Sequence, residues 1–284
     1  MRIASAPLRI TLGGGGSDLS PDGHFITATI NKYVSVIVAD GFDGGYLCHY
    51  SEHEHATTPA QIKHPLIRRA VELLEVKPNI QITSIADVPA GTGLGSSGSF
   101  TVALVKALTE WDDPERIADT ACAIDTTGWQ DQYSATFGGL RAYTPDTRTR
   151  LPHRRELDTH LAMFYTGHRR SAADTLPYTA TNPDDVKLIA KDAEGALIAG
   201  DMGLFAATLN HQWLLKLAAH PSAIHLWCDS LIQGAIREGL AVAGKLMGAG
   251  DGGFLLFYTE DRERLVASIP LRHVPFTLVG HGVR

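Results

Sequence analysis

The chain has 284 residues, 44% of them hydrophobic, which is enough apolar material for one large domain or two modest ones. Its 31 acidic and 25 basic side chains give a net charge of −6, so the composition argues against nucleic acid or an anionic membrane as a partner. No apolar run approaches the roughly 20 residues that a membrane-spanning helix needs, and residues 1–9 lack the apolar stretch of a signal peptide.

The N-terminal half mixes runs typical of strands with runs typical of helices. Residues 79–85 alternate apolar and polar side chains, as a half-buried strand does. Strands are expected over residues 2–12, 33–40, 79–85 and 138–143, and helices over residues 65–76, 100–108 and 114–124. The last of these helices begins with Pro114 in a favourable first-turn position after Asp113.

A polar stretch over residues 144–152 is the best candidate for a domain boundary. Beyond it, strands are expected over residues 160–165, 253–259 and 273–278, and helices over residues 183–198, 202–217 and 223–238. We therefore expect an α+β protein of two parts, residues 1–152 and 153–284.

The most informative segment lies between the strand at 79–85 and the helix at 100–108. Residues 87–100 read Asp-Val-Pro-Ala-Gly-Thr-Gly-Leu-Gly-Ser-Ser-Gly-Ser-Phe. Glycines permit positive φ and let a phosphate approach the backbone closely. The helix that follows offers free N–H groups at the positive end of its dipole, and the Ser96 and Ser97 hydroxyls can contact a phosphate oxygen or a metal ion. The segment predicts a phosphate-binding loop.

Two better-known glycine loops are excluded by single positions. A P-loop requires a lysine after its last glycine, and none follows Gly95 or Gly98. The dinucleotide fingerprint Gly-x-Gly-x-x-Gly would need glycine at position 96, where the chain has Ser96. A dinucleotide-dependent oxidoreductase is therefore not favoured, and an ordinary glycine-rich turn remains the simplest alternative.

The full string resembles the central motif of the GHMP kinases, a superfamily named for galactokinase, homoserine kinase, mevalonate kinase and phosphomevalonate kinase. The resemblance implies a ribosomal-S5-like N-terminal ATP-binding domain, a ferredoxin-like C-terminal domain, and ATP and Mg²⁺ as cofactors. It implies that ATP is held by Pro89, Gly91, Gly93, Leu94, Gly95, Ser96, Ser97 and Gly98.

Residues 6–19 place a strand before four glycines, a serine and an aspartate. The glycines would let a substrate lie against the backbone at Gly15, Gly16 and Ser17, while Asp18 could accept hydrogen bonds from sugar hydroxyls. Arg9, fixed on the strand, could face an anion. Taken alone, the segment could be a flexible loop, but it resembles the substrate motif of the heptose-phosphate kinase branch.

Residues 129–140 carry an acidic residue between two amides, followed by a double glycine. In the resemblance, Asp131 aligns with the carboxylate proposed as general base in several GHMP kinases, with Arg9 as the cation beside it. The alternative is that Asp131 is a structural cap. Ser97 matches the serine that contacts Mg²⁺ in the superfamily, and Asp125 is the nearest match to the second ligand. A water-bridged Mg²⁺ is the alternative to that second ligand.

Smaller matches over residues 27–33, 50–52, 63–66, 165–172 and 212–216 resemble the bacterial heptose 7-phosphate kinases. Those enzymes phosphorylate the anomeric hydroxyl of a sugar that already bears a phosphate, which requires a second cationic pocket. The candidate cations are Arg169, Arg170 and Lys216, with solvated surface cations as the alternative.

Residues 243–258 resemble the C-terminal glycine motif of the superfamily, with Asp251 where relatives commonly carry another glycine. A carboxylate at this position could contact a substrate hydroxyl or point to solvent. Because the chain is shorter than usual for this branch, a C7 cyclitol phosphate such as a valienol-type 7-phosphate is the alternative acceptor. A non-catalytic regulator that binds sugar and nucleotide is a further alternative.

The remaining features concern surroundings and partners. Cys48, Cys122 and Cys228 are odd in number and widely separated, which is typical of free thiols in a reducing cytoplasm. The histidines between residues 53 and 64 lack the spacing of a known metal site and are interpreted as surface side chains. The expected partner is a small phosphorylated sugar or cyclitol, with no nucleic acid or membrane, and a homodimer is compatible with the sequence.

Overall fold

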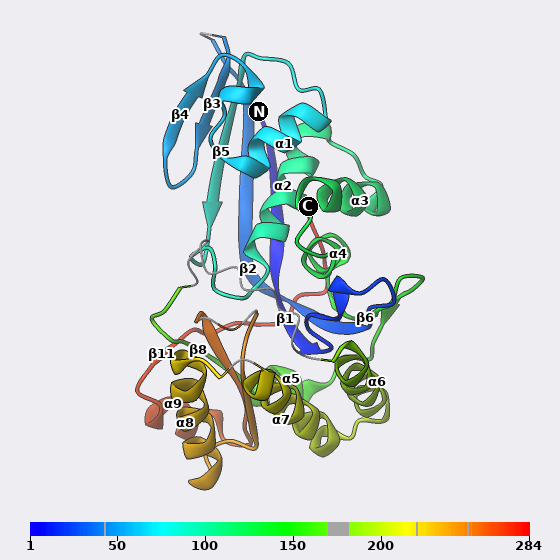
Figure 1. Ribbon diagram of the computed structural model, residues 1–284, viewed down its shortest axis with the longest axis vertical. Coiled ribbons are helices and arrows are strands. Elements are labelled where there is room, and N and C mark those ends of the chain that lie inside the picture. Colours follow the sequence, from blue (N-terminus) through cyan, green and yellow to red (C-terminus); the bar gives the residue numbers. More distant parts are fainter. Residues whose placement is uncertain (43, 170–181, 220, 249, 251) are drawn as a thin grey trace.

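The computed structural model describes residues 1–42, 44–169, 182–219, 221–248, 250 and 252–284. Its first sheet has seven strands in the order β4-β3-β5-β2-β6-β7, with β1 paired to β2 (Figure 1). The strands are β1 (Arg2–Gly13), β2 (Phe25–Asp40), β3 (Tyr46–His49), β4 (His53–Ala56), β5 (Ile80–Ala86), β6 (Leu140–Tyr143) and β7 (Arg148–Arg150). All of the pairs are antiparallel except β3 with β5.

The first sheet is covered on one face by helices (Figure 1). These are α1 (Pro65–Leu73), α2 (Ser96–Thr109), α3 (Pro114–Ile124) and α4 (Gln130–Phe137), with single 3₁₀ turns at Ser17–Leu19 and Pro59–Gln61. The sequence of α2 is apolar or small on nearly every side, so the helix is buried along most of its length between the sheet and the other helices. Its N-terminus is thereby held rigidly beside β1.

The second sheet is antiparallel in the order β11-β8-β10-β9 and lies below the first one in Figure 1. Its strands are β8 (Leu161–Tyr165), β9 (Ala243–Leu246), β10 (Phe254–Tyr258) and β11 (Arg272–His273). The helices that accompany it are α5 (Arg155–His160), α6 (Pro183–Ala199), α7 (Met202–Ala219), α8 (Ala223–Arg237) and α9 (Arg262–Ser268). None of the helices in the described residues is long and apolar enough to cross a bilayer.

The α+β class predicted from the sequence is confirmed, and most expected elements are present within a few residues. The prediction for β2 was too short, because the alternating run Phe25–Ile30 continues through Asn31 and Lys32 into the expected strand. The prediction for the last strand was too long, because regular pairing stops at His273 and only a single bridge joins Leu278 to Ile30. The boundary at residues 152 and 153 stays a prediction.

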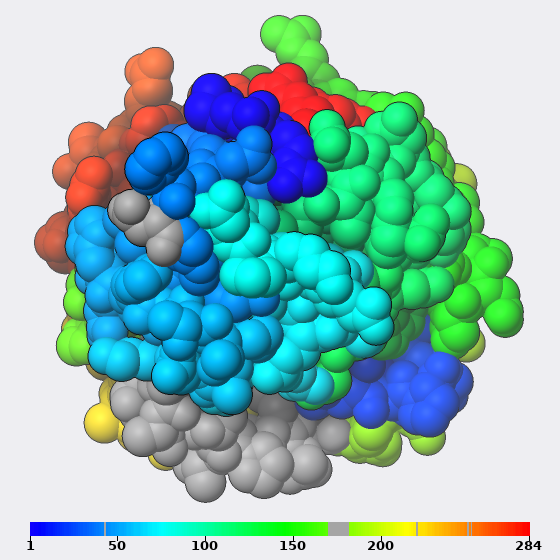
Figure 2. Space-filling view, turned by 90° about the horizontal axis from the view of Figure 1, so that it is seen from above, coloured from blue at the N-terminus to red at the C-terminus, as the bar shows by residue number. Residues whose placement is uncertain are grey.

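Two segments of the C-terminal half pack against the first sheet. Helix α6 lies against Gly13, where an added Cβ would be only 3.1 Å from the Ala193 Cβ. The last residues run antiparallel to the start of β1: Ser5 N donates to Arg284 O at 2.7 Å, and Arg284 N donates to Ser5 O at 3.1 Å. Figure 2 shows the two ends of the chain side by side on one face. The cavity described below is therefore framed by segments from both halves.

The C-terminal tail also packs tightly on α4. A Cβ at position 282 would lie 1.8 Å from Thr136 O, a backbone atom of α4, whereas one at position 280 would meet only the flexible Arg150 Nη2, at 3.1 Å. We expect Gly282→Ala to lower the free energy of unfolding by about 1–3 kcal/mol, because the tail or the helix must move. Thermal denaturation of Gly282→Ala and of the wild type measures this difference.

The matched control is Gly280→Ala, which adds the same methyl group two residues away. We expect its melting temperature to stay close to that of the wild type, because only the end of a flexible side chain must move. Equal melting temperatures for the two variants would contradict the close packing of the tail on α4.

Candidate active site

A cavity of about 450 Å³ lies where the two halves of the chain meet. It is bordered by β1, the turn after it, the loop before α2, the start of α4, and the loop between β9 and β10. Its lining is mostly glycines and polar side chains, and includes Arg9, Thr11, Gly15, Gly16, Asp18, Gly91, Gly93, Gly95, Ser96, Ser97, Thr127, Gln130, Asp131, Gln132, Gln212, Lys216, Lys245 and Met247. Such a lining suits a ligand with many hydroxyls and phosphates better than an apolar one.

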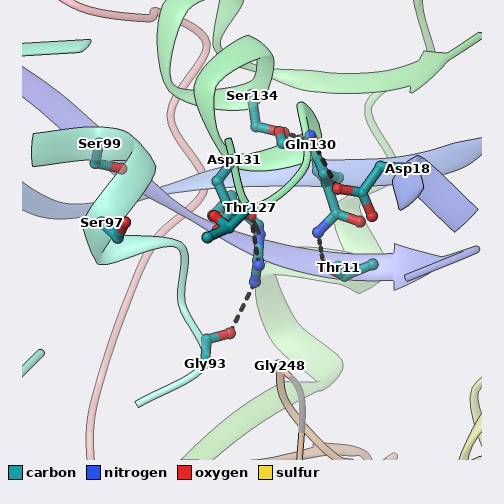
Figure 3. Close-up of polar contacts among 12 residues, drawn as sticks. Thr11, Asp18, Gly93, Ser97, Ser99, Thr127, Gln130, Asp131, Ser134 and Gly248 are labelled. Atoms are coloured by element: carbon teal, nitrogen blue, oxygen red, sulfur yellow. Dashed lines mark hydrogen bonds and ion pairs between the residues drawn. The ribbon is translucent and has the colours of Figure 1, made fainter. Parts of the chain in front are cut away.

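An ion pair between Arg9 and Asp131 occupies the middle of the cavity wall. Arg9 Nε and Nη2 donate to Asp131 Oδ1 at 2.8 and 2.6 Å, and Arg9 Nη1 donates to Gly93 O at 2.7 Å (Figure 3). The Arg9 residue is 5% exposed, whereas the Asp131 side chain keeps 29% of its surface exposed. The arginine is therefore fixed, and it presents the carboxylate to the cavity.

The Gln130 amide supports this pair from α4. With its oxygen turned toward β1, the amide accepts from Thr11 Oγ1 at 2.8 Å and from Arg9 Nε at 3.1 Å. Thr11 and Arg9 lie two residues apart on β1 and so face the same side of the strand. The guanidinium is thus held by groups from α4 and the loop before α2, and Thr11 of β1 holds the Gln130 amide in place.

The loop before α2 has the geometry predicted for a phosphate-binding loop. Gly91, Gly93 and Gly95 all have positive φ, and Gly95 caps the helix that starts at Ser96. The loop is fastened to β1 because Arg9 N donates to Leu94 O at 3.1 Å. Free N–H groups at the start of α2 therefore face the cavity, at the positive end of the helix dipole.

Close glycine contacts bring three segments to one point. An added Cβ at Gly98 would lie 2.4 Å from the Asp131 Cβ, so α2 and α4 can approach closely only without it. On the other side of the loop, a Cβ at Gly93 would lie 2.6 Å from Met247 O, and one at Gly248 would lie 2.3 Å from the Gly93 Cα. The C-terminal glycine loop therefore packs against the phosphate loop.

Asp18 also lines the cavity; it lies in the 3₁₀ turn after β1, on the other side of Gln130 from Asp131 in Figure 3. Gln130 N donates to its Oδ2 at 3.3 Å. Burial and, next, the negative charge of Asp131 raise the pKa of Asp18 to about 6, while the Gln130 N–H and Arg9 act in the opposite direction. Asp18 therefore titrates close to neutral pH rather than near its ordinary value of 3.8.

Ser97 and Asp125, the predicted metal ligands, are in contact. The Ser97 hydroxyl donates to Asp125 Oδ2, and the other carboxylate oxygen accepts from Thr127 Oγ1 at 2.7 Å and from Thr127 N at 3.3 Å. Asp125 is 3% exposed and caps the C-terminus of α3. Two oxygen ligands thus meet beside the first turn of α2, where Ser97 reaches the cavity.

Several predicted site residues support the cavity without lining it. Pro89 O accepts from Thr92 Oγ1 inside the loop, the Leu94 side chain is fully buried, and Gly98 provides the contact with α4. The Ser17 hydroxyl is buried and donates to His24 O, so it holds together the turn that follows β1. Lys216 does line the cavity, while the predicted residues Arg170 and Asp251 lie outside the described residues.

The lining also includes polar side chains that were not predicted as site residues, among them Thr11, Gln130, Gln132, Gln212 and Lys245. Gln130 and Gln132 were visible as the two amides that flank Asp131. Thr11 had a weaker signal, its spacing of two residues from Arg9 on a strand. Gln212 and Lys245 lie in segments that resemble the family, but α7 and β9 bring these two side chains to the cavity only through the packing of the C-terminal half.

Comparison with known proteins finds sugar kinases among those that the chain resembles. Residues 65–139 match the family described as GHMP kinases N terminal domain. The chain is 28% identical to the D-glycero-alpha-D-manno-heptose 7-phosphate kinase of Campylobacter jejuni, over 91% of this chain and 89% of the relative. It is also 26% identical to the L-fucokinase/L-fucose-1-P guanylyltransferase of Bacteroides fragilis, over 69% of this chain and 24% of that protein.

Solved structures give the same fold. A crystal structure of a D-glycero-D-manno-heptose 1-phosphate kinase from Bacteroides thetaiotaomicron matches with a TM-score of 0.79 and 25% identity, covering 100% of this chain and 98% of that chain. Lactococcus lactis galactokinase complexed with galactose matches with the same TM-score at 14% identity, covering 100% of this chain and 94% of that chain. The two-domain GHMP kinase architecture expected from the resemblance is confirmed.

The contact between Gly98 and Asp131 gives a first test of the site. We expect Gly98→Ala to lower the turnover number at least tenfold, because the added methyl group must push the start of α4, and Asp131 with it, away from the cavity. ADP release with the preferred acceptor measures the effect. Gly195→Ala on α6, where an added Cβ meets nothing within 4 Å, is the control that should keep full activity. Equal rates in the two variants would rule out a positional role for the α2–α4 contact.

The raised pKa of Asp18 gives a second test, on stability. Below pH 4 Asp18 is protonated in both the folded and the unfolded chain. Between pH 4 and 6 only the folded chain keeps the proton on Asp18. The ionisation of Asp18 above pH 6 therefore lowers the free energy of unfolding. We expect Asp18→Asn to have a higher melting temperature than the wild type at pH 8, and the difference should disappear as the pH falls to 4. A difference that grew toward low pH would contradict this.

Proposed function

We propose that this chain, a sugar kinase of the GHMP family, transfers the γ-phosphate of ATP to a hydroxyl of a C7 sugar phosphate, the anomeric hydroxyl of a heptose 7-phosphate. The observation that carries the proposal is the Arg9–Asp131 pair, which lies in one cavity with the N-terminus of α2 and the two glycine loops. A carboxylate base and a phosphate-binding helix end in one cavity are the parts that phosphoryl transfer to a hydroxyl requires.

Asp131 would act on the acceptor hydroxyl. Both of its guanidinium hydrogen bonds use Oδ1, so Oδ2 remains for the incoming hydroxyl. As the acceptor oxygen bonds to the γ-phosphorus, the bond from phosphorus to the β-phosphate oxygen breaks and ADP leaves. The hydroxyl proton passes to Asp131 Oδ2. Arg9 keeps the carboxylate aligned for that transfer and places a positive charge beside it.

The loop before α2 would hold the donor. Its backbone N–H groups, at Ser96 and Ser97 and in the turn before them, point toward the side of the cavity where the γ-phosphate must lie. Positive φ at Gly93 and Gly95 keeps side chains away from that approach. The loop thus supplies fixed dipoles where charge develops during transfer, which is the main way that a protein lowers the barrier to this reaction.

The site also fits a magnesium ion. Mg²⁺ prefers oxygen ligands and keeps several waters, so one carboxylate and one hydroxyl beside the ATP phosphates suffice. The Asp125 carboxylate and the Ser97 hydroxyl, already in contact, would hold it. When bound, the ion would neutralise part of the negative charge of the ATP phosphates.

The cavity and the relatives support this acceptor. Asp18 lines the same cavity as Asp131 and can accept hydrogen bonds from hydroxyls next to the reacting one. The related enzyme from Campylobacter jejuni is named as a heptose 7-phosphate kinase and aligns over nearly the whole chain. The orientation of the Asp131 carboxylate by Arg9 favours a catalyst over a non-catalytic regulator.

The experiment is an ADP-release assay with Mg-ATP and a panel of heptose, heptose 7-phosphate, hexose phosphates and a C7 cyclitol 7-phosphate. We expect release with D-glycero-D-manno-heptose 7-phosphate, and at least a 1,000-fold lower turnover number in Asp131→Asn, which can no longer take up the proton. Asp112→Asn removes an exposed carboxylate outside the cavity and is the control that should keep the wild-type rate.

Three results would change the proposal. Release only with the cyclitol phosphate would keep the mechanism and replace the acceptor. Nucleotide binding without release on any member of the panel would contradict the heptose assignment and favour the regulator. A wild-type turnover number in Asp131→Asn would remove Asp131 from the role of base.

A further inference from the structure

Lys245 is a buried lysine at the cavity that the catalytic scheme does not use. It lies on β9, its residue is 3% exposed, and its ammonium group donates to Thr11 O at 2.9 Å and to the Gln212 side-chain oxygen. Lys216 approaches from α7, with its ammonium 3.0 Å from Leu246 O and 2.5 Å from Gly248 O. Both side chains line the same cavity.

The surroundings of Lys245 are costly for a cation. Its two hydrogen-bond acceptors are neutral, a peptide carbonyl and an amide, and no carboxylate of the described residues lies within ion-pair distance of it. Burial lowers the pKa of Lys245 well below its ordinary value, and the charges of Lys216 and Arg9 lower it further. A leucine or methionine would fill this position without that cost. The lysine is therefore better explained by a ligand than by the packing of β9.

The position of Lys245 suits the far end of the acceptor. The carbonyl that it contacts belongs to Thr11, two residues beyond Arg9, which is roughly 7 Å along β1. In Figure 3, Ser97 and Thr11 lie on opposite sides of Asp131. A hydroxyl at Asp131 would thus have the start of α2 on one side, and on the other the part of β1 that Lys245 contacts.

We propose that Lys245 binds the phosphate group that the acceptor already carries. This inference rests on the proposed function and names the residue that selects a phosphorylated acceptor over a free sugar. An incoming dianion supplies the negative charge that the buried ammonium lacks, and Lys216, close enough to act electrostatically on Lys245, adds to the attraction. Gln212 and the Thr11 carbonyl orient the ammonium group.

The first test separates binding of the acceptor from catalysis. We expect Lys245→Met to raise the KM for heptose 7-phosphate about 10- to 100-fold, the range expected for a charge-assisted hydrogen bond. The turnover number and the KM for ATP should change less than about threefold. Activity on heptose without the phosphate, however low, should not fall. Lys191→Met on the exposed surface of α6 is the matched control and should change none of these values.

A structural role for Lys245 makes the opposite prediction. If the lysine only joined β9 to β1, its loss would lower the melting temperature and reduce all activities together. We expect the melting temperature of Lys245→Met to equal or exceed that of the wild type, because a buried ammonium is removed without leaving a cavity. A lower melting temperature with an unchanged KM for the phosphorylated acceptor would overturn the proposal.

A second measurement works even if the acceptor is not a heptose phosphate. With the nucleotide site filled by a non-hydrolysable ATP analogue and Mg²⁺, calorimetric titration with inorganic phosphate should show binding to the wild type and to Lys191→Met. Binding should be at least tenfold weaker in Lys245→Met. That result supports a phosphate-binding site at Lys245 even when no sugar of the panel causes ADP release. No phosphate binding to the loaded wild type, or equal binding in Lys245→Met, would overturn the subsite while leaving the kinase reaction intact.

Discussion

The ion pair between Arg9 and Asp131 is the contact on which the rest of the site depends. Arg9 is almost fully buried on β1, and its guanidinium bonds both the carboxylate on α4 and the Gly93 carbonyl in the phosphate loop. One side chain thereby fixes the distance between the predicted base and the predicted phosphate site. A buried guanidinium is stable only if its donors find acceptors, so the requirement for satisfied hydrogen bonds holds three segments of the chain in one arrangement.

Glycines make that arrangement sterically possible. Helix α2 reaches α4 at Gly98, and the phosphate loop reaches the C-terminal glycine loop at Gly93 and Gly248. At each of these points a single added methyl group would overlap backbone or Cβ atoms, so the elements could not approach to the distance at which the Arg9–Asp131 pair forms. Close packing here also excludes water, which strengthens the interactions of the charged groups that remain. The glycine motifs therefore define the shape of the site as well as its affinity for phosphate.

What the sequence predicted well is local, and what it missed depends on distant packing. The phosphate loop could be predicted because the positive φ angles at Gly91, Gly93 and Gly95 favour glycine, and closely spaced glycines can be seen in the sequence. Helix α4 was not predicted, since Gln130–Phe137 has no strong amphipathic pattern and is held mainly by its neighbours. Lys245 was seen only as part of the segment that resembles the C-terminal glycine motif, because a contact with a carbonyl more than 200 residues earlier leaves no local pattern. That a lysine is buried at a cavity can be recognised only when the residues packed around it are known.

The two halves of the chain contribute different parts of the reaction. The predicted base, its arginine, the phosphate loop and the predicted metal ligands all come from residues before the second sheet, so in the proposed reaction the first half would fix the position of the transferred phosphoryl group. The second half contributes Gln212, Lys216 and Lys245 to the same cavity. Because the proposed chemical step needs only a hydroxyl beside Asp131, the cations of β9 and α7 could change without disturbing the ion pair. In the proposed scheme Asp18 of the first half recognises acceptor hydroxyls, and Lys245 of the second half is the position at which a preference for phosphorylated sugars would be gained or lost.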